Sequence, residues 1–238
     1  MNIKEKYFNK EFLKKNLSSF ILISCTAILI TVTGIYFKQS FFRMLPLYIS
    51  LMVAQLQSRV NRYGSLLGSM NSLIYAAVYV YYALYGSVLS ALLVSFPIQL
   101  LTFIRWNKNK WEQSTILKRM KLKYLILLLL LFAVVLIAMW WVLPLLGAQY
   151  VFLDSTATVL GTLTSFLTMF AFVEYTFFMV AGCVLNLVLY IQMLQDSPET
   201  ITFLVFGVYS LICAVLGAVR ATKLYKSQQK QISESSAE

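Results

Sequence analysis

The chain has 238 residues, of which 60% are hydrophobic and 12% charged, and its mean hydropathy is +0.75. Soluble domains are roughly 45–50% apolar and about 25% charged, so this composition excludes a water-soluble globule. It equally excludes a disordered chain, which has low hydrophobicity. The net charge of +11 fits basic loops on the cytoplasmic face of a membrane better than it fits nucleic-acid binding.

The residue types present also exclude several kinds of chemistry. The chain has no histidine, which rules out His-based catalytic triads and the common zinc sites. Cys25, Cys183 and Cys213 each lie in an apolar run, and no CxxC pair occurs. We therefore expect no metal site, no cofactor and no disulfide framework. No nucleophile–base pair is visible, so the chain is not expected to be an enzyme.

Eight apolar segments predict transmembrane helices, because a helix needs about 20 apolar residues to cross a bilayer. The segments are 17–37, 41–57, 63–83, 85–105, 122–146, 155–172, 174–194 and 199–219. The first segment follows five lysines, as a signal peptide would. It is longer than a signal-peptide core, however, and no small-residue cleavage site follows it, so we expect a retained helix.

The basic residues indicate how the chain is oriented in the cell membrane, which is the inner or plasma membrane. With the N-terminus inside, the inner segments hold 18 of the 20 Lys and Arg residues. They are divided as five in 4–15, two in 59–62, seven in 105–123 and four in 220–230. Only Lys38 and Arg43 fall outside. Because basic loops stay in the cytoplasm, both termini are predicted to be cytoplasmic.

The predicted fold class is an all-α polytopic membrane protein with about eight transmembrane helices. Two parallel three-helix repeats joined by a linker helix, a 3+1+3 arrangement like that of SWEET transporters, would follow an extra first helix. Such repeats place a substrate site between them near the middle of the membrane. The expected division is a basic N-terminus (1–16), the extra helix (17–40), the first repeat (41–106), a basic cytoplasmic loop (107–121), the linker helix (122–147), the second repeat (153–220) and a cytoplasmic tail (221–238).

Polar residues at membrane depth indicate where a ligand binds, since an unpaired polar group in hydrocarbon is costly. Asn71 shares one helical stripe with Tyr75 and Tyr79. This stripe fits either a ligand-binding wall or helix packing with an interhelical hydrogen bond. In the fourth segment, Gln99 follows Pro97, which frees a backbone carbonyl and makes a lined cavity plausible.

The seventh segment carries Asn186 at its middle, and this amide is a further candidate for ligand binding. Asp154 and Glu174 lie near the starts of the sixth and seventh segments, where N-terminal capping is expected of them. No carboxylate lies in mid-span, which argues against a proton-coupled pump. Amides, phenols and other aromatic side chains suit a flat, neutral or near-neutral ligand that forms hydrogen bonds.

The chain from about residue 41 onwards resembles the PnuC-type nicotinamide riboside transporters. The first half carries Gly68-Ser-Met-Asn71, Leu84-Tyr85, Pro97-Ile-Gln99 and Trp106, and the second half carries LDSTATVL and FVEYTFF. The family's ligand-binding motif, W-x-x-W-x-x-x-N, is replaced here by Thr176, Met179 and Cys183. Both indoles and the amide are therefore missing, and Asn186 could compensate for the lost amide.

The resemblance implies facilitated uptake of nicotinamide riboside or a related nucleoside or vitamin, without a coupling ion. A cytosolic kinase would trap the substrate without forming a stable complex. The altered motif leaves deoxynucleosides, thiamine and riboflavin as alternatives, and a substrate-capture subunit of an energised importer is the alternative from another class. The expected partners are a nucleoside-like small molecule and the lipid bilayer but no nucleic acid, and a homo-oligomer is left open. The candidate substrate-binding residues are Asn71, Tyr75, Tyr79, Gln99, Thr176, Met179, Cys183 and Asn186.

Overall fold

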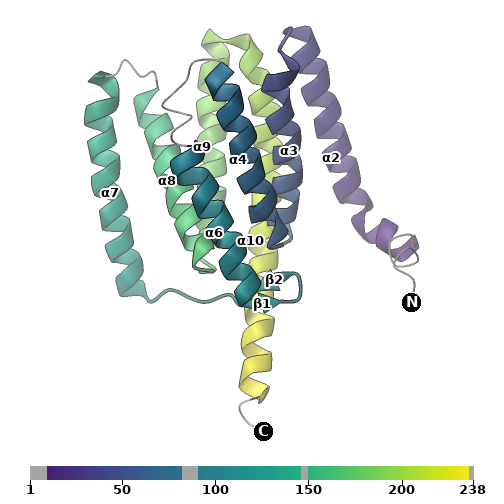
Figure 1. Cartoon of the computed structure of the whole chain (residues 1–238), viewed down its shortest axis with the longest axis vertical. Coiled ribbons are helices and arrows are strands. Elements are labelled where there is room, and N and C mark those ends of the chain that lie inside the picture. The colour runs from purple at the N-terminus through teal and green to yellow at the C-terminus, as the bar shows by residue number, and fades with distance from the viewer. Residues whose placement is uncertain (1–9, 82–90, 146–149, 236–238) are drawn as a thin grey trace.

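The computed structural model is all-helical apart from one short hairpin, and it describes residues 10–81, 91–145 and 150–235 (Figure 1). The first half consists of α2 (Lys10–Tyr36), α3 (Phe41–Ser58), α4 (Tyr63–Tyr81), a π-helical turn (Ala91–Ser95) and α6 (Phe96–Lys108). Strands β1 (Lys110–Trp111) and β2 (Ser114–Thr115) pair in an antiparallel hairpin. The second half consists of α7 (Leu122–Leu145), α8 (Val151–Met169), α9 (Tyr175–Asp196), a 3-10 turn (Pro198–Thr200) and α10 (Ile201–Ser235).

Five helices in the described ranges are long and apolar enough to cross a membrane: α2, α7, α8, α9 and α10. Helices α3 and α4 have 18 and 19 residues but are not among these five, and they carry the amides Gln55, Gln57 and Asn71. The expected span at 85–105 begins among residues that the structure does not describe. Lower hydropathy in α3 and α4 is what a bundle with a polar interior requires, because these polar groups avoid lipid by facing other helices.

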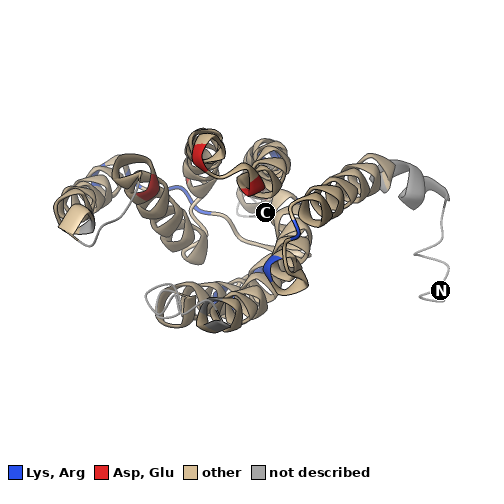
Figure 2. Ribbon diagram, turned by 90° about the horizontal axis from the view of Figure 1, so that it is seen from above, with Lys and Arg blue, Asp and Glu red and all other residues tan. Residues whose placement is uncertain are grey.

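Six helices form a closed ring through their successive contacts. Helix α3 packs against α4, α4 against α6, α6 against α8, α8 against α9, α9 against α10 and α10 against α3. Helix α7 packs on the outside of this ring against α8, and α2 packs against α3 and α10. Seen from above, the helix that leads from the N-terminus extends away from the others (Figure 2). The ring therefore encloses the interior, while α2 and α7 present most of their apolar side chains outwards.

Two seams, α3–α10 and α6–α8, join the two halves of the ring, and the backbones approach closely at the α3–α10 seam. A Cβ atom added to Gly217 would lie 3.3 Å from the Cα atom of Ser58. The Tyr209 hydroxyl donates to the Leu51 carbonyl at 2.9 Å. Arg220 donates through Nη1 to the Ser58 carbonyl at 3.0 Å and to the Ser58 Oγ at 3.2 Å. The pKa of Arg59, which follows the end of α3, is lowered mainly by its partial burial. The positive charge of the nearby Arg220 lowers it further.

Two tight turns at the same end of the bundle have the same hydrogen-bond pattern. After α3, the Val60 and Asn61 amides donate to the Gln57 and Leu56 carbonyls. After α8, the amides of Ala171 and Phe172 donate to the carbonyls of Thr168 and Leu167. Val60 and Ala171 are left-handed, with φ of 53° and 59°. Both turns are Schellman motifs, which satisfy the last carbonyls of a helix. A valine in this conformation is unusual, and Val60 is held there by burial.

Several boundaries differ from those expected. Helix α10 does not end near residue 220 but continues to Ser235, and a hairpin occupies part of the basic loop. Helix α8 begins at Val151, so Asp154 lies in its first turn and is not the N-cap. Pro97 lies in the first turn of α6, directly after the π-helical turn. This follows because proline cannot donate to the preceding turn and clashes with its carbonyl, so the helix restarts there.

The bonds from Arg220 make the α3–α10 seam sensitive to mutation. Arg220→Met keeps most of the apolar stem but removes both hydrogen bonds to Ser58, and should lower the free energy of unfolding by about 1–3 kcal/mol. The matched control is Lys223→Met, because Lys223 lies in the same helix and is exposed. Thermal unfolding in detergent should show a lower midpoint for the first variant only. Equal midpoints would mean that Arg220 does not stabilise the seam.

Candidate functional site

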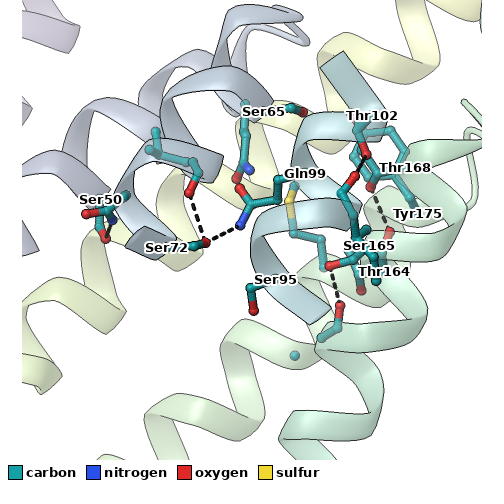
Figure 3. Close-up of a pocket in the computed structure, with 18 of the residues that line it drawn as sticks. Ser50, Ser65, Ser72, Ser95, Gln99, Thr102, Thr164, Ser165, Thr168 and Tyr175 are labelled. Carbon is teal, nitrogen blue, oxygen red and sulfur yellow. Dashed lines mark hydrogen bonds between the residues drawn. The ribbon is translucent and has the colours of Figure 1, made fainter. Parts of the chain in front are cut away.

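A cavity of about 440 Å³ lies inside the ring, between α3, α4, α6, α8 and α9. Hydroxyl and amide side chains dominate its polar lining, and none of the described residues that line it is charged. The hydroxyl residues other than tyrosine are Ser50, Ser65, Ser72, Ser95, Thr102, Thr164, Ser165 and Thr168 (Figure 3), and the amides are Gln57, Asn61, Asn71, Gln99 and Asn186. A volume of this size suits one small organic molecule.

Most of the candidate residues from the sequence meet in this cavity. The lining includes Asn71, Tyr75, Gln99, Met179, Cys183 and Asn186. Thr176 is not among the lining residues: it is fully buried, and its hydroxyl donates to the Val173 carbonyl at 2.9 Å. The side chain of Tyr79 lies outside the described residues, although its backbone is part of α4.

Asn71 joins two helices and also lines the cavity. Its Nδ2 donates to the Pro46 carbonyl at 3.2 Å and to the Ser50 Oγ at 2.9 Å, which joins α4 to α3. Its Oδ1 is buried and has no hydrogen-bond partner. A buried acceptor without a partner is costly. Asn71 lines the cavity as a residue, but this oxygen has no accessible surface towards it.

Gln99 belongs to α6, and its amide lies against Gly68 and Ser72 of α4. Its Nε2 donates to the Ser72 Oγ at 3.1 Å, and that hydroxyl donates to the Gly68 carbonyl at 3.1 Å (Figure 3). A methyl group on Gly68 would overlap the Gln99 Oε1. Gly68 is therefore the residue that lets the Gln99 amide approach α4 so closely.

The α9 wall of the cavity is less polar than the α4 wall. Met179, Cys183 and Asn186 follow one face of α9 at spacings of four and three residues. The Cys183 thiol lies 3.5 Å from the Ser210 hydroxyl of α10. The Asn186 Nδ2 donates to the Gly182 carbonyl of its own helix at 3.0 Å. A thioether and a thiol thus stand where the resembling family has an indole and an amide.

Helix α8 supplies a polar wall that our sequence analysis missed. Ala157, Gly161, Thr164, Ser165 and Thr168 line the cavity, and their spacing of three to four residues places them on one helical face. This spacing of small and hydroxyl residues in the sequence could have identified the wall. The Thr164, Ser165 and Thr168 hydroxyls donate to carbonyls one turn earlier. Their oxygens can still accept hydrogen bonds from a ligand.

Two aromatic residues line the end of the cavity near the hairpin. The Trp106 Nε1 donates to the Thr168 carbonyl at 2.8 Å, which joins α6 to α8. The ring centroids of Trp106 and Tyr175 lie 6.5 Å apart in an edge-to-face arrangement. Glu174 is the N-cap residue of α9, as expected, but its side chain makes no capping hydrogen bond and accepts from the Met120 amide at 3.3 Å. Trp106 was singled out by the sequence only as part of the family resemblance.

Two glycines in the cavity wall test the close approach of Gln99. Gly68→Ala should displace the end of the Gln99 side chain and break its hydrogen bond to Ser72, which costs about 0.5–1.5 kcal/mol and offsets the gain in helix propensity. Gly161 also lines the cavity, but a Cβ there would meet nothing within 4 Å. Gly161→Ala should stabilise α8 by up to about 1 kcal/mol through helix propensity. Thermal unfolding in detergent separates the two, and equal destabilisation would disprove the account of Gly68.

Comparison with known proteins gives one family and one solved structure. The family model described as nicotinamide mononucleotide transporter matches residues 40–223. A crystal structure titled as that of the vitamin B3 transporter PnuC is similar at a TM-score of 0.72 and 19% sequence identity. The similarity covers 92% of this chain and 99% of the other. A search of curated protein sequences gave no significant match.

Proposed function

This chain belongs to the nicotinamide mononucleotide transporter family, whose model matches most of its length, and on that premise we propose that it facilitates the uptake of nicotinamide riboside or a closely related nucleoside. A membrane transporter needs a site inside its helix bundle, and the 440 Å³ cavity supplies one. The observation that carries the proposal is the lining of this cavity by uncharged hydroxyl, amide and aromatic side chains among the described residues.

The uncharged lining favours a nucleoside over a nucleotide. A phosphate group in a closed site is normally held by arginine, lysine or a helix N-terminus. No Lys or Arg is among the described residues that line this cavity. Nicotinamide riboside has hydroxyl groups on its ribose and a carboxamide, which the amides and hydroxyls can bind. Its positively charged ring suits the aromatic faces of Tyr75, Trp106 and Phe178.

The discrimination against phosphate is open to direct measurement. Nicotinamide riboside should bind at least about 100-fold more tightly than nicotinamide mononucleotide, because burying an unpaired phosphate costs several kcal/mol. Isothermal titration calorimetry on the purified protein compares the two ligands under one set of conditions. Equal or tighter binding of the mononucleotide would overturn the proposed substrate class.

A deoxynucleoside is the second candidate, and the α9 wall favours it. Met179 and Cys183 line the cavity where the resembling family has an indole and an amide, whereas Thr176 lies outside the cavity. Replacing an amide by a thiol removes both a strong donor and a strong acceptor. Methionine adapts to ligands of different shapes. A less polar wall tolerates a sugar without one hydroxyl, so deoxyadenosine belongs in the same titration, together with thiamine and riboflavin.

Transport is proposed to occur by rocking of two parallel three-helix repeats, α3–α4–α6 and α8–α9–α10, with α7 as the linker. A shift of 111 residues takes the turn at Val60 to the turn at Ala171, and both have the same hydrogen bonds. The same shift takes the Ser72–Gln99 contact to the Cys183–Ser210 contact. It also takes seven cavity-lining residues to other lining residues: Ser50, Val53, Gln57, Gly68, Asn71, Ser72 and Tyr75 correspond to Gly161, Thr164, Thr168, Met179, Gly182, Cys183 and Asn186.

The same proposal includes the orientation of the protein in the membrane and the fate of the substrate after its release. The hairpin end of the bundle carries most of the Lys and Arg residues, which supports a cytoplasmic location of that end and of both termini. A substrate released there would be retained if a cytosolic kinase phosphorylated it. This trapping supplies a direction to uptake without a coupled ion.

Asn71 gives the most specific test of the site. Asn71→Leu removes an amide from the cavity wall, and should weaken binding of nicotinamide riboside about three- to tenfold. Leu73→Ala is the control, because Leu73 lies on the same helix and points outwards with an exposed fraction of 43%. Calorimetry should show the loss for Asn71→Leu alone. Unchanged affinity would mean that Asn71 only holds α3 and α4 together and does not contribute to ligand binding.

A further inference from the structure

Residues 109–120, here called the strap, join α6 to α7 and lie across the hairpin end of the ring (Figure 1). The tip of the strap touches the turn between α3 and α4. There the Arg62 amide donates to the Gln113 carbonyl at 3.0 Å, and the Arg62 Nη1 donates to the Glu112 carbonyl at 2.9 Å. The strap is thereby attached to the first half of the ring.

The other end of the strap is bonded to the second half of the ring. The Lys118 amide donates to the Ala171 carbonyl at 2.8 Å, and the Val173 amide donates to the Lys118 carbonyl at 2.9 Å. Both partners lie in the turn between α8 and α9. The strap therefore bridges the two tight turns that have the same hydrogen-bond pattern, one from each half of the ring.

The side chain of Gln228 in α10 forms two hydrogen bonds, here called the clasp, to the middle of the strap. Its Nε2 donates to the Thr115 carbonyl and its Oε1 accepts from the Leu117 amide, both at 2.9 Å. Its side chain has no exposed area, although it lies in the extension of α10 beyond the expected end of the membrane span. A long polar side chain is rarely buried completely unless it is paired in this way. The neighbouring Gln229 is exposed.

The strap also bounds the space behind Trp106. A second cavity of about 140 Å³ is lined by Thr115, Ile116 and Lys118 of the strap, by the end of α8 and by Trp106. Trp106 lines the 440 Å³ cavity as well. Its indole, of which 3% is exposed, thus separates the inner cavity from a smaller one that the strap covers. Leu117 of the strap packs in the same buried cluster as Trp106.

We propose that Gln228 is a positioning residue for transport, which holds the strap across both halves of the ring and so keeps Trp106 seated as the barrier at this end of the cavity. Release of the strap from Gln228 frees the two turns to separate and lets Trp106 move away from Thr168. This inference rests on the proposed rocking of the two halves. It does not depend on which substrate the cavity binds.

Gln228→Leu tests the clasp, because it removes both hydrogen bonds and keeps a similar apolar volume. Amide hydrogen exchange in the strap, at Leu117 above all, should become about tenfold faster, as expected for the loss of two hydrogen bonds. Cys183, which lines the inner cavity, reports on the barrier. Its modification by a small thiosulfonate reagent, read by mass spectrometry of the purified protein, should also become about tenfold faster.

Two further variants complete the experiment. Gln229→Leu is the matched control and should change neither rate. Gln228→Glu retains the acceptor for Leu117 but loses the donor to Thr115, so both rates should also rise above those of the wild type. This variant keeps the proposal testable if Gln228→Leu does not fold, which thermal unfolding reveals.

The proposal is overturned by faster exchange in the strap without faster modification of Cys183, because the strap would then be unconnected to the barrier. It is equally overturned if neither rate changes, or if Gln229→Leu has the same effect. Neither measurement uses a substrate. A failure of nicotinamide riboside to bind would therefore contradict the proposed function and leave this test intact.

Discussion

The cost of exposing polar groups to hydrocarbon is the constraint on which the rest of this structure depends. Amide and hydroxyl side chains in membrane helices must face other helices or a ligand. Here they face inwards from five helices of the ring and form one cavity of about 440 Å³. None of the described side chains of α2 and α7 lines this cavity, and α7 is almost wholly apolar. The same physical cost therefore forms the cavity and turns the apolar side chains of the outer helices towards lipid.

Close helix approach decides how the polar groups are used. Gly68 lets the Gln99 amide lie over α4 and bond to Ser72, whereas the corresponding contact on the other side pairs Cys183 with Ser210. The position equivalent to Gly68 is Met179, which fills space instead of opening it. Under the proposed repeat relation, the α4 and α9 walls occupy equivalent positions in the two repeats but differ in polarity. A ligand in this cavity therefore meets an amide-rich wall on one side and a sulfur-containing wall on the other.

The two seams of the ring differ in a way that bears on movement. The α3–α10 seam has a close backbone approach at Gly217 and buried hydrogen bonds from Tyr209 and Arg220. Across the α6–α8 seam, Trp106 donates a single side-chain hydrogen bond to Thr168, and the strap reinforces this end from outside the ring. Conformational change in packed helices concentrates where contacts can be exchanged between discrete arrangements. A seam held mainly by side chains, such as Trp106 and the Arg105 guanidinium over the Phe170 ring, and by an external strap meets this condition better than one closed by backbone contact.

The sequence by itself determined the membrane class, the helical content and six of the residues that line the cavity. Hydropathy depends on composition over about 20 residues, and the 3.6-residue period places Asn71 and Tyr75 on one face whatever the partner helix is. Only the tertiary structure decided which face of α9 meets the cavity. It turned Met179 and Cys183 inwards and buried Thr176 elsewhere, because the rotation of a helix is set by its neighbours. The role of Gln228 was also invisible in the sequence, since its partners Thr115 and Leu117 lie more than 100 residues away and only the fold brings them together.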